Sequence, residues 1–162
     1  MREMRRSRQC LGEAETLEIL DRGSHGVLAL IGDGGYPYAL PISYARESDR
    51  LYMHCAKAGH KLDALRAEPR ASFCVVARDE VVPEEFTTRY RSAIAFGRIH
   101  ELAGEEEILR ALRLLCAKYC PEAAEAAVEA EIARERAGVN VLEFKIERLS
   151  GKQARELIGK GG

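Results

Sequence analysis

The feature that most restricts this sequence is an apolar run that ends in a glycine-rich turn. Residues 26–31 read Gly-Val-Leu-Ala-Leu-Ile, and Gly-Asp-Gly-Gly follows at 32–35. Glycine and aspartate tolerate the positive φ angles that tight turns between antiparallel strands require. The pattern therefore predicts a β-strand over 26–31 and, beyond the turn, a second strand over 36–45.

Further strand signals follow at short intervals. Pro37 and Pro41 lie in the second strand and cannot donate ladder hydrogen bonds, so this strand is expected at a sheet edge or beside a bulge. A polar turn at 47–50 leads into a third strand at 51–55, and short turns predict that the first three strands form an antiparallel meander. The remaining strands are predicted over 70–77, over 90–97 with an extension toward Leu102, and over 139–149.

Helical periodicity appears between the strands. Helices are predicted over 13–21, over 59–66, from Gly104 onward and over 121–136. The apolar residues of the third helix, Leu109, Leu112, Leu115 and Cys116, recur at helical spacing and are interpreted as core. The fold class is therefore mainly β, a six-stranded antiparallel barrel with flanking helices. The late position of the last strand favours a Greek-key or split closure.

Length and charge restrict the class of function. A chain of 162 residues fits one domain, expected over 11–153, between flexible segments at 1–10 and 154–162. The formal net charge of -1 argues against nucleic-acid binding. No apolar run approaches the roughly 18 residues of a membrane span. The arginine-rich stretch at 1–8 is interpreted as a solvated terminus.

The cysteines indicate a reducing compartment. Their number is odd and no pair has the C-x-x-C spacing, so neither a zinc site nor a disulfide framework is expected. Free thiols that behave as small hydrophobic side chains fit a cytoplasmic protein. Cys55, beside the segment described next, is the one whose reactivity we would test. The five are Cys10, Cys55, Cys74, Cys116 and Cys120.

Residues 54–61, His-Cys-Ala-Lys-Ala-Gly-His-Lys, carry candidate chemistry. A strand ends here, Gly59 allows a close approach of the backbone, and a helix begins near His60. Cations at a helix start oppose the helix dipole unless an anion is present, and His60, Lys61 and Lys57 all lie here. The segment fits a phosphate- or carboxylate-binding loop. On these residues alone, a solvated basic turn is the better interpretation.

His54 has several interpretations on its own. It fits a histidine satisfied within the core, a ligand contact or a residue of a subunit interface. A metal site built on His54 and His60 would need more ligands, and Cys55 points to the opposite face of the strand. No G-x-S-x-G motif is present, and the order of residues supports no Ser-His-Asp set.

Six segments in a fixed order carry a family resemblance: 26–29, 35–43, 51–63, 71–76, 86–97 and 146–152. Through them the sequence resembles the pyridoxamine 5′-phosphate oxidase-like FMN-binding split barrels, and within these the branch that includes nitroimidazole-resistance proteins. The resemblance covers roughly residues 11 to 153. It implies a homodimer with FMN at the subunit interface, in contact with both chains.

The resemblance also assigns roles to residues. It implies that the flavin ring lies against the strand of Pro41, Ile42 and Ser43. The strand end of Met53, His54, Cys55 and Ala56 is expected to line the same pocket. His60 and Lys61 match positions near the phosphate, and Ser92 matches a further hydrogen-bond donor.

The implied activity is a flavin-dependent reductase, in which the flavin supplies the redox step. Electrons would pass from a nicotinamide or other donor to a small aromatic acceptor such as a nitroimidazole. His54 would orient the acceptor or move a proton. The arginine-rich substrate motif of the members that oxidise pyridoxamine phosphate is absent, so that activity is not expected. The alternative is a flavin- or haem-binding protein without turnover, with His54 or His60 as an axial ligand.

Overall fold

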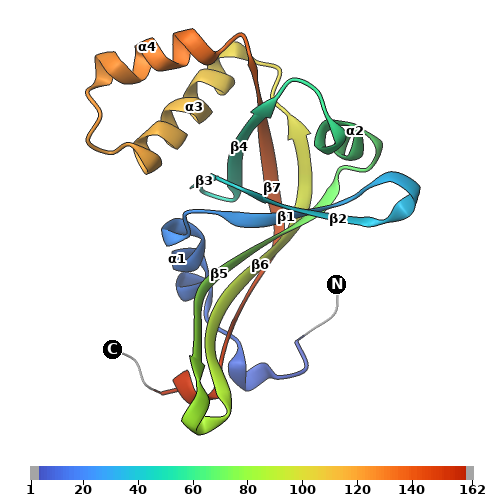
Figure 1. Cartoon of the computed structure of the whole chain (residues 1–162), viewed down its shortest axis with the longest axis vertical. Coiled ribbons are helices and arrows are strands. Elements are labelled where there is room, and N and C mark those ends of the chain that lie inside the picture. The colour runs from blue at the N-terminus through green and yellow to red at the C-terminus, as the bar shows by residue number, and fades with distance from the viewer. Residues whose placement is uncertain (1–3, 160–162) are drawn as a thin grey trace.

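The computed structural model describes residues 4–159 and is built on one antiparallel sheet of seven strands (Figure 1). The strands are paired in the order β2-β1-β5-β6-β7-β4-β3. Their bounds are Gly26–Ile31 (β1), Pro37–Ile42 (β2), Ala45–Glu47 (β3), Arg50–Ala56 (β4), Arg70–Val82 (β5), Thr87–Glu101 (β6) and Val139–Gln153 (β7). The mainly β, split-barrel fold class is confirmed. The strand count is seven because the predicted strand over 36–45 is interrupted at Ser43 and Tyr44.

The junction between β2 and β3 closes the barrel. These strands lie at opposite ends of the pairing order, yet only Ser43 and Tyr44 separate them in the chain. Tyr44 is fully buried, and its ring meets Phe73 of β5 edge-on at 4.8 Å between centroids. The chain therefore crosses here from one edge strand of the sheet to the other, and we call the gap between these two edges the seam of the barrel. The aromatic pair of Tyr44 and Phe73 lies beneath it.

The predicted meander of the first three strands is wrong. β2 pairs with β1 alone, whereas β4 pairs with β3 and β7. Short turns correctly indicated the local hairpins β1–β2 and β3–β4, but the bend at Ser43 and Tyr44 sends the two hairpins to opposite edges of the sheet. The edge position expected for the proline-containing strand is confirmed, because β2 has a single partner.

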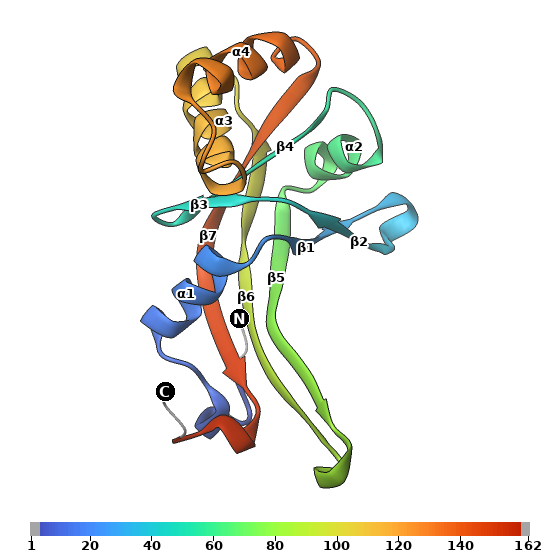
Figure 2. The same ribbon diagram turned by 60° about the vertical axis from the view of Figure 1, so that its left-hand side comes forward.

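β5 and β6 continue beyond the barrel as a long hairpin, which Figure 2 shows projecting from the body of the molecule. The prediction ended the first of these strands at residue 77 and began the second at residue 90, whereas they run to Val82 and from Thr87. The hairpin turns through the 3-10 segment Pro83–Glu85 and Phe86, whose φ is 50°. Residues 76–81 of β5 are exposed on both faces, and residues 87–92 of β6 are half-buried throughout. The extension therefore lacks the apolar alternation that marks a half-buried strand.

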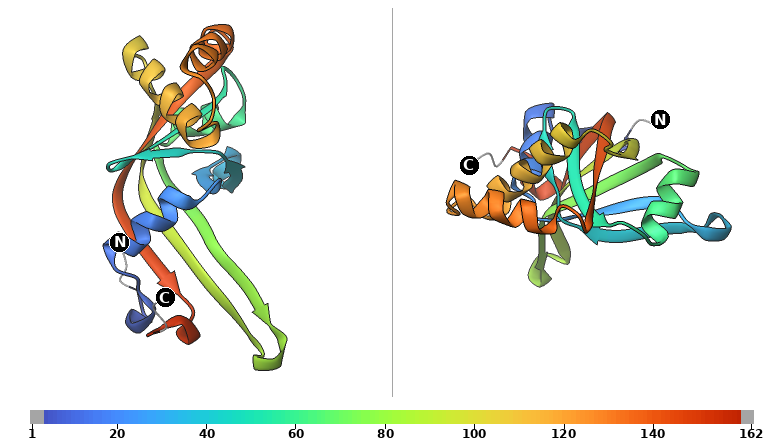
Figure 3. Two further views of the ribbon diagram at one scale, coloured as in Figure 1. Left: turned by 90° about the vertical axis from the view of Figure 1, so that its left-hand side faces the viewer. Right: turned by 90° about the horizontal axis from the view of Figure 1, so that it is seen from above.

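Four helices flank the barrel: α1 Glu13–Arg22, α2 His60–Ala67, α3 Glu105–Tyr119 and α4 Glu125–Glu135. All four were predicted, although α4 begins four residues after Pro121 because a turn precedes it. α3 and α4 pack against each other, and α3 lies over β3, β4 and β7. Figure 3 shows this helical pair outside the barrel wall. No helix within residues 4–159 has the length and apolar composition to span a membrane.

The core has two parts, separated by the barrel wall. The alternation of side chains in β4 divides them: Leu51 and Met53 face the barrel interior, and Tyr52 faces α3. Phe73 and Phe144 are completely buried inside the barrel. Between the wall and the helices lie Ile108, Ala111, Leu112, Leu115 and Ile132. The helical hairpin therefore has a small core of its own.

The two segments predicted to be flexible lie together where the structure describes them. Residues 1–3 and 160–162 fall outside the described part of the chain. The 3-10 segments Ser7–Gln9 and Arg155–Leu157 line the same cavity, and Cys10 forms a bridge with Lys152 of β7. Gln9 and Ala154 are buried. The mobility of these segments remains a prediction.

Candidate functional site

The predicted anion-binding loop connects β4 to α2. Gly59 precedes the helix with φ 128°, and a Cβ atom built there would meet no atom within 4 Å. This backbone conformation is accessible almost only to glycine. The first N–H groups of a helix have no carbonyl partner within it, so those of His60 and Lys61 are available to a ligand. An anion therefore has both space and donors at the start of α2.

His60 contacts the turn between β1 and β2. Its ring stacks on Tyr38 at 4.2 Å between centroids, with an interplanar angle of 19°. Its Nε2 atom lies 3.7 Å from the carboxylate of Asp33 and 3.4 Å from the Asp33 backbone nitrogen. The Nε2 atom accepts the hydrogen bond of the Asp33 backbone N–H group. His60 thus joins α2 to the turn, and Lys61 and Lys57 are the other cations of this segment that a bound anion could meet.

Lys61 is half-buried beside the end of β4, close to Cys55. Burial raises the pKa of the Cys55 thiol, and the charge of Lys61 opposes this rise. The Glu101 carboxylate also acts to raise the Cys55 pKa, and it is held by Arg66 at 2.6 and 2.9 Å and by Asn140 at 2.5 Å. Cys55 is therefore a protonated, weakly nucleophilic thiol at neutral pH.

His54 and Ser43 line a pocket between the barrel wall and the helical hairpin. Its volume is about 520 Å³, which is within the usual range for small-molecule sites. The apolar part of the lining is Leu112, Leu115, Ile132 and Val139. The polar and charged part is Tyr119, Glu131, Arg134 and Glu135, together with Cys116 and Cys120. An exposed imidazole thus faces an apolar cavity that suits a small aromatic molecule.

The hydroxyl of Tyr119 fixes one end of this pocket. It lies 2.6 Å from the carbonyl oxygen of Ser24 and 2.8 Å from the backbone nitrogen of Tyr44, whose hydrogen bond it accepts. This contact joins the last residue of α3 to the junction between β2 and β3. Ser43 is therefore held next to the helix that forms the opposite wall.

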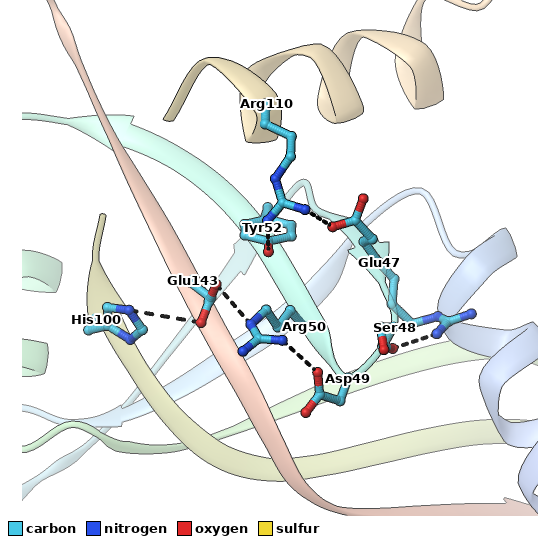
Figure 4. A network of polar contacts seen from close by, with 9 residues as sticks. Glu47, Ser48, Asp49, Arg50, Tyr52, His100, Arg110 and Glu143 are labelled. Carbon is cyan, nitrogen blue, oxygen red and sulfur yellow. Dashed lines mark hydrogen bonds and ion pairs between the residues drawn. The ribbon is translucent and has the colours of Figure 1, made fainter. Parts of the chain in front are cut away.

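A polar network holds α3 over the barrel wall (Figure 4). Glu143 of β7 is almost buried and lies 3.1 Å from the Arg50 Nε atom, with His100 at 3.9 Å on its other side. From α3, Arg110 donates to the Tyr52 hydroxyl at 3.0 Å and pairs with Glu47. Burial raises the pKa of Tyr52, and the charge of Glu143 adds to this rise. The network orients the helix that forms one pocket wall.

The structure separates the residues that the sequence analysis grouped. Met53 is buried in the barrel core and Ile42 packs against it, whereas His54 faces outward. Pro41 and Ala56 are exposed. Ser43, His54 and Lys61 lie toward one end of the barrel, around the end of β4. Of the predicted site residues, only Ser43 and His54 line the pocket.

Ser92 lies far from this group within one chain. Ser92 pairs with Lys152 of β7, whereas His54 pairs with Val141 of the same strand. These β7 residues are eleven apart, and at about 3.3 Å per residue the separation along the strand is roughly 36 Å. One protomer therefore cannot bring Ser92 and His54 to the same small ligand.

The outer face of β1, β5 and β6 is apolar and exposed. Val27 is opposite Cys74, which is opposite Ile94, so these side chains form a row across three strands. Val76 is 62% exposed, and Ile94 and Phe96 are 37% and 38% exposed. Contiguous apolar surface of this kind is typical of an interface.

The helical side of the pocket was not predicted from the sequence. The prediction that Leu112 and Leu115 are core residues is confirmed, but these residues also line the pocket. Apolar residues at helical spacing give the same pattern in both cases, so the sequence did not indicate the pocket. It also gave no role to Tyr119 or to the Glu143 network. Free thiols were expected, and the five cysteines are free. No group of three or more metal-ligating side chains occurs within residues 4–159.

Comparisons with known proteins agree with this architecture. A family model described as pyridoxamine 5′-phosphate oxidase matches residues 12–153. An FAD and haem binding protein from Mycobacterium smegmatis is 28% identical, covering 96% of this chain and 80% of that one, with a TM-score of 0.74. No curated protein matches the sequence.

Two more distant structures share the fold. A conserved protein from Mycobacterium tuberculosis is 19% identical, with a TM-score of 0.78 and coverage of 96% of this chain and 92% of that one. A protein described as a candidate 5-nitroimidazole antibiotic resistance protein from Bacteroides thetaiotaomicron is also 19% identical, with a TM-score of 0.75 and coverage of 89% and 86%.

Proposed function

The chain belongs to the pyridoxamine 5′-phosphate oxidase family, and we propose that it binds FMN and passes electrons from the reduced flavin to a small aromatic acceptor. The observation that carries the proposal is the double role of the end of β4. This strand directs His54 into an apolar pocket and leads within a few residues to the open helix start at Gly59. A phosphate-binding group and an acceptor pocket are thus held by one rigid element.

The residues at the start of α2 fit a single phosphate. Gly59 leaves space in front of the helix, Lys61 supplies a positive charge, and the free N–H groups supply donors. We favour FMN over FAD because this donor set suits one terminal phosphate. The M. smegmatis relative, which is named for binding FAD, supports a flavin of either kind.

A second copy of the chain completes the proposed site. Ser92 and His54 lie too far apart for one protomer, and a two-fold contact through the apolar face of β1, β5 and β6 would bring Ser92 from the partner. Pairing of this face would also remove Val76, Ile94 and Phe96 from water. The proposed assembly is a homodimer with two shared flavin sites.

When bound, FMN supplies reversible redox chemistry, and the protein supplies binding and orientation. Leu112, Leu115 and Ile132 exclude water from the acceptor pocket. His54 faces this cavity, where its imidazole can orient a polar substituent of the acceptor or hold a proton for it. A planar nitroaromatic such as a nitroimidazole fits these requirements, with a nicotinamide as the electron donor.

The experiment is an anaerobic mixing measurement. Reduced, FMN-loaded protein is mixed with a 5-nitroimidazole, and the return of oxidised flavin absorbance is followed. We expect faster reoxidation than for free reduced FMN, and a slower rate in His54→Gln. His25→Gln, at an exposed residue outside the pocket lining, is the matched control. Reoxidation no faster than that of free FMN would contradict the reductase proposal.

Haem binding is a second candidate function. The M. smegmatis relative is named for binding haem as well as FAD, and His54 presents an exposed imidazole to a pocket. His60 suits the role of axial ligand less well because its ring is stacked on Tyr38. The absorption spectrum of the protein after addition of haem tests this second function, because axial ligation sharpens and shifts the haem bands. If His54 is the axial ligand, His54→Gln would abolish this change.

A further inference from the structure

Two cysteines line the pocket that also holds His54. Cys116 lies in the last turn of α3, and Cys120 is the residue that follows this helix. Cys116 is half-buried, Cys120 is exposed, and both thiols are free. The function proposed above uses this pocket for an aromatic acceptor and gives neither thiol a role.

The helix places the two thiols within reach of each other. The backbone nitrogen of Cys120 donates to the carbonyl oxygen of Cys116 at 2.8 Å, which is the hydrogen bond of one helical turn. Four residues of an α-helix advance about 6 Å along its axis, and the Cα atoms of disulfide-bonded cysteines lie about 4.4–6.8 Å apart. Residues four apart also project from the same face of a helix. The backbone spacing is therefore compatible with a disulfide between these two residues.

The chain leaves the helix at Cys120. This residue has φ -134° and ψ 55°, and a turn follows at 121–123. Rotation of the Cys120 side chain toward Cys116 therefore needs no change in the hydrogen bonds within α3. The exposed thiol can move while the half-buried one is held by the helix.

The environments of the two thiols differ. Burial raises the pKa of the Cys116 thiol, and the negative charge of a Cys120 thiolate adds to this rise. Cys116 therefore keeps its proton at neutral pH, whereas the exposed Cys120 is the thiol that a ligand in the pocket meets first. The pair combines an accessible nucleophile with a neighbouring proton donor.

A nitroaromatic acceptor would yield a thiol-reactive product in this pocket. Transfer of two electrons and two protons to a nitro group gives a nitroso compound and water, and the flavin supplies these electrons. The nitrogen of a nitroso group is an electrophile that thiols attack. Leu112, Leu115 and Ile132 line the pocket together with both cysteines, so an aromatic ring held by the apolar side chains shares one cavity with the thiols.

We propose that Cys116 and Cys120 act as a dithiol that reduces an arylnitroso compound to an arylhydroxylamine, an inference that rests on the proposed reduction of nitroaromatics. The Cys120 sulfur forms a bond to the nitroso nitrogen, and the thiol proton passes to the nitroso oxygen. The Cys116 sulfur then attacks the Cys120 sulfur, so that an S–S bond forms, the N–S bond breaks and the nitrogen takes the Cys116 proton. The nitroso group gains two electrons, and the two thiols are oxidised to a disulfide. Two molecules of a low-molecular-weight thiol, which are oxidised in turn, restore the dithiol.

The test uses nitrosobenzene, which needs no flavin to react with thiols. Reduced wild-type protein, freed of added thiol, is mixed anaerobically with one equivalent of nitrosobenzene. The expected products are one N-phenylhydroxylamine per chain, measured by chromatography, and a disulfide between Cys116 and Cys120. Trypsin cleaves between the two cysteines, after Lys118, so the disulfide joins the peptides 114–118 and 119–134, which mass spectrometry detects as a linked pair.

Variants of each thiol separate the two steps. Cys120→Ser should form neither the disulfide nor N-phenylhydroxylamine, and Cys116→Ser should stop at an adduct of one nitrosobenzene on Cys120. We expect the wild type to form N-phenylhydroxylamine at least about tenfold faster than glutathione at equal thiol concentration, because its second thiol is held beside the first. Cys74→Ser, at a half-buried thiol of β5 outside the pocket lining, is the matched control and should react as the wild type does. Far-UV circular dichroism checks that each variant is folded.

Three results would overturn the proposal. The first is the absence of a disulfide between peptides 114–118 and 119–134. The second is formation of N-phenylhydroxylamine by folded Cys120→Ser at the wild-type rate, and the third is a wild-type rate no higher than that of glutathione. The reaction is run without FMN, so none of these results bears on flavin binding or on nitro reduction. A chain that forms the disulfide but does not accelerate flavin reoxidation by a nitroimidazole would contradict the reductase proposal alone.

Discussion

The hydroxyl of Tyr119 accepts a hydrogen bond from the backbone nitrogen of Tyr44 at 2.8 Å, and this contact joins α3 to the seam of the barrel. Tyr119 is the last residue of the helix, and Tyr44 lies in the two-residue bend between β2 and β3. One pocket wall comes from each side of this contact. The pocket therefore depends on a bond between residues that are 75 positions apart in the chain.

Removal of this hydroxyl should destabilise the protein. Tyr119→Phe leaves the buried N–H group of Tyr44 without a partner, which costs about 1–3 kcal/mol. We expect the free energy of unfolding, measured by urea denaturation, to fall by this amount. Tyr36→Phe is the matched control because Tyr36 is 78% exposed. The free energy of unfolding of this variant should equal that of the wild type. Equal stability of Tyr119→Phe and the wild type would contradict the role given to this contact.

A second prediction concerns the backbone at the start of α2. Gly59→Ala forces a side chain into a conformation with φ 128°, and such strain costs of the order of 1–3 kcal/mol. We expect weaker FMN binding by fluorescence titration and a lower free energy of unfolding. Gly138→Ala is the control, since its φ is not positive and the nearest atom to a Cβ there is at an ordinary 3.5 Å. Full retention of FMN affinity in Gly59→Ala would argue against an anion at this loop.

A third prediction separates the phosphate from the flavin ring. Lys61→Gln should raise the dissociation constant of FMN by about tenfold through loss of a charge-assisted contact. The dissociation constant of riboflavin, which lacks the phosphate, should stay the same. Lys145→Gln, at an exposed lysine of β7, should change neither. An equal loss of affinity for FMN and for riboflavin would mean that Lys61 does not contact the phosphate.

The strand and turn signals identified most of the fold because local chemistry determines those elements. Gly34 and Gly35 have φ angles of 64° and 79°, as the tight turn at 32–35 required. The path of the chain at Ser43 and Tyr44 could not be predicted, because it depends on the closure of the whole sheet. The contacts that fix this path are the packing of Tyr44 on Phe73 and the hydrogen bond between Tyr44 and Tyr119. Both join residues that are distant in sequence.

The candidate site was predicted in part for a similar reason. The positive φ of Gly59 follows from the residue type and the helix start. The Asp33 contact of His60 does not, since it joins residues 27 positions apart. The helical wall of the pocket gave the same apolar pattern as a core helix. The closeness of the two chain ends gave no local signal either, since residues 7–9 and 155–156 come together only in the folded chain.

A fourth prediction concerns alkaline pH. Burial raises the pKa of Tyr44 well above its usual value near 10, so the folded protein keeps this proton while the unfolded chain loses it above about pH 10. Stability is therefore lost as the pH rises through that range, by at most about 1.4 kcal/mol per pH unit for this group. In Tyr44→Phe the unfolding free energy should have a shallower slope above pH 10. If the unfolding free energy of Tyr44→Phe falls as steeply with pH as that of the wild type, groups other than Tyr44 cause the loss of stability at alkaline pH.

A fifth prediction tests the second copy. Ile94→Asp places a charge on the exposed apolar face of β6 and should shift the protein from dimer to monomer in sedimentation velocity. The same variant should lose FMN affinity, because the partner's contribution to each site is lost. Ala130→Asp, at an exposed residue of α4, is the control. A wild-type protein that sediments as a monomer with FMN present would contradict the shared site.

The most direct test of the claim that this chain binds FMN is a titration of the purified protein with FMN. Binding is monitored by the quenching of flavin fluorescence. We expect saturable binding at one FMN per chain, tighter than the binding of riboflavin. No saturable binding at concentrations up to about 1 mM would contradict it.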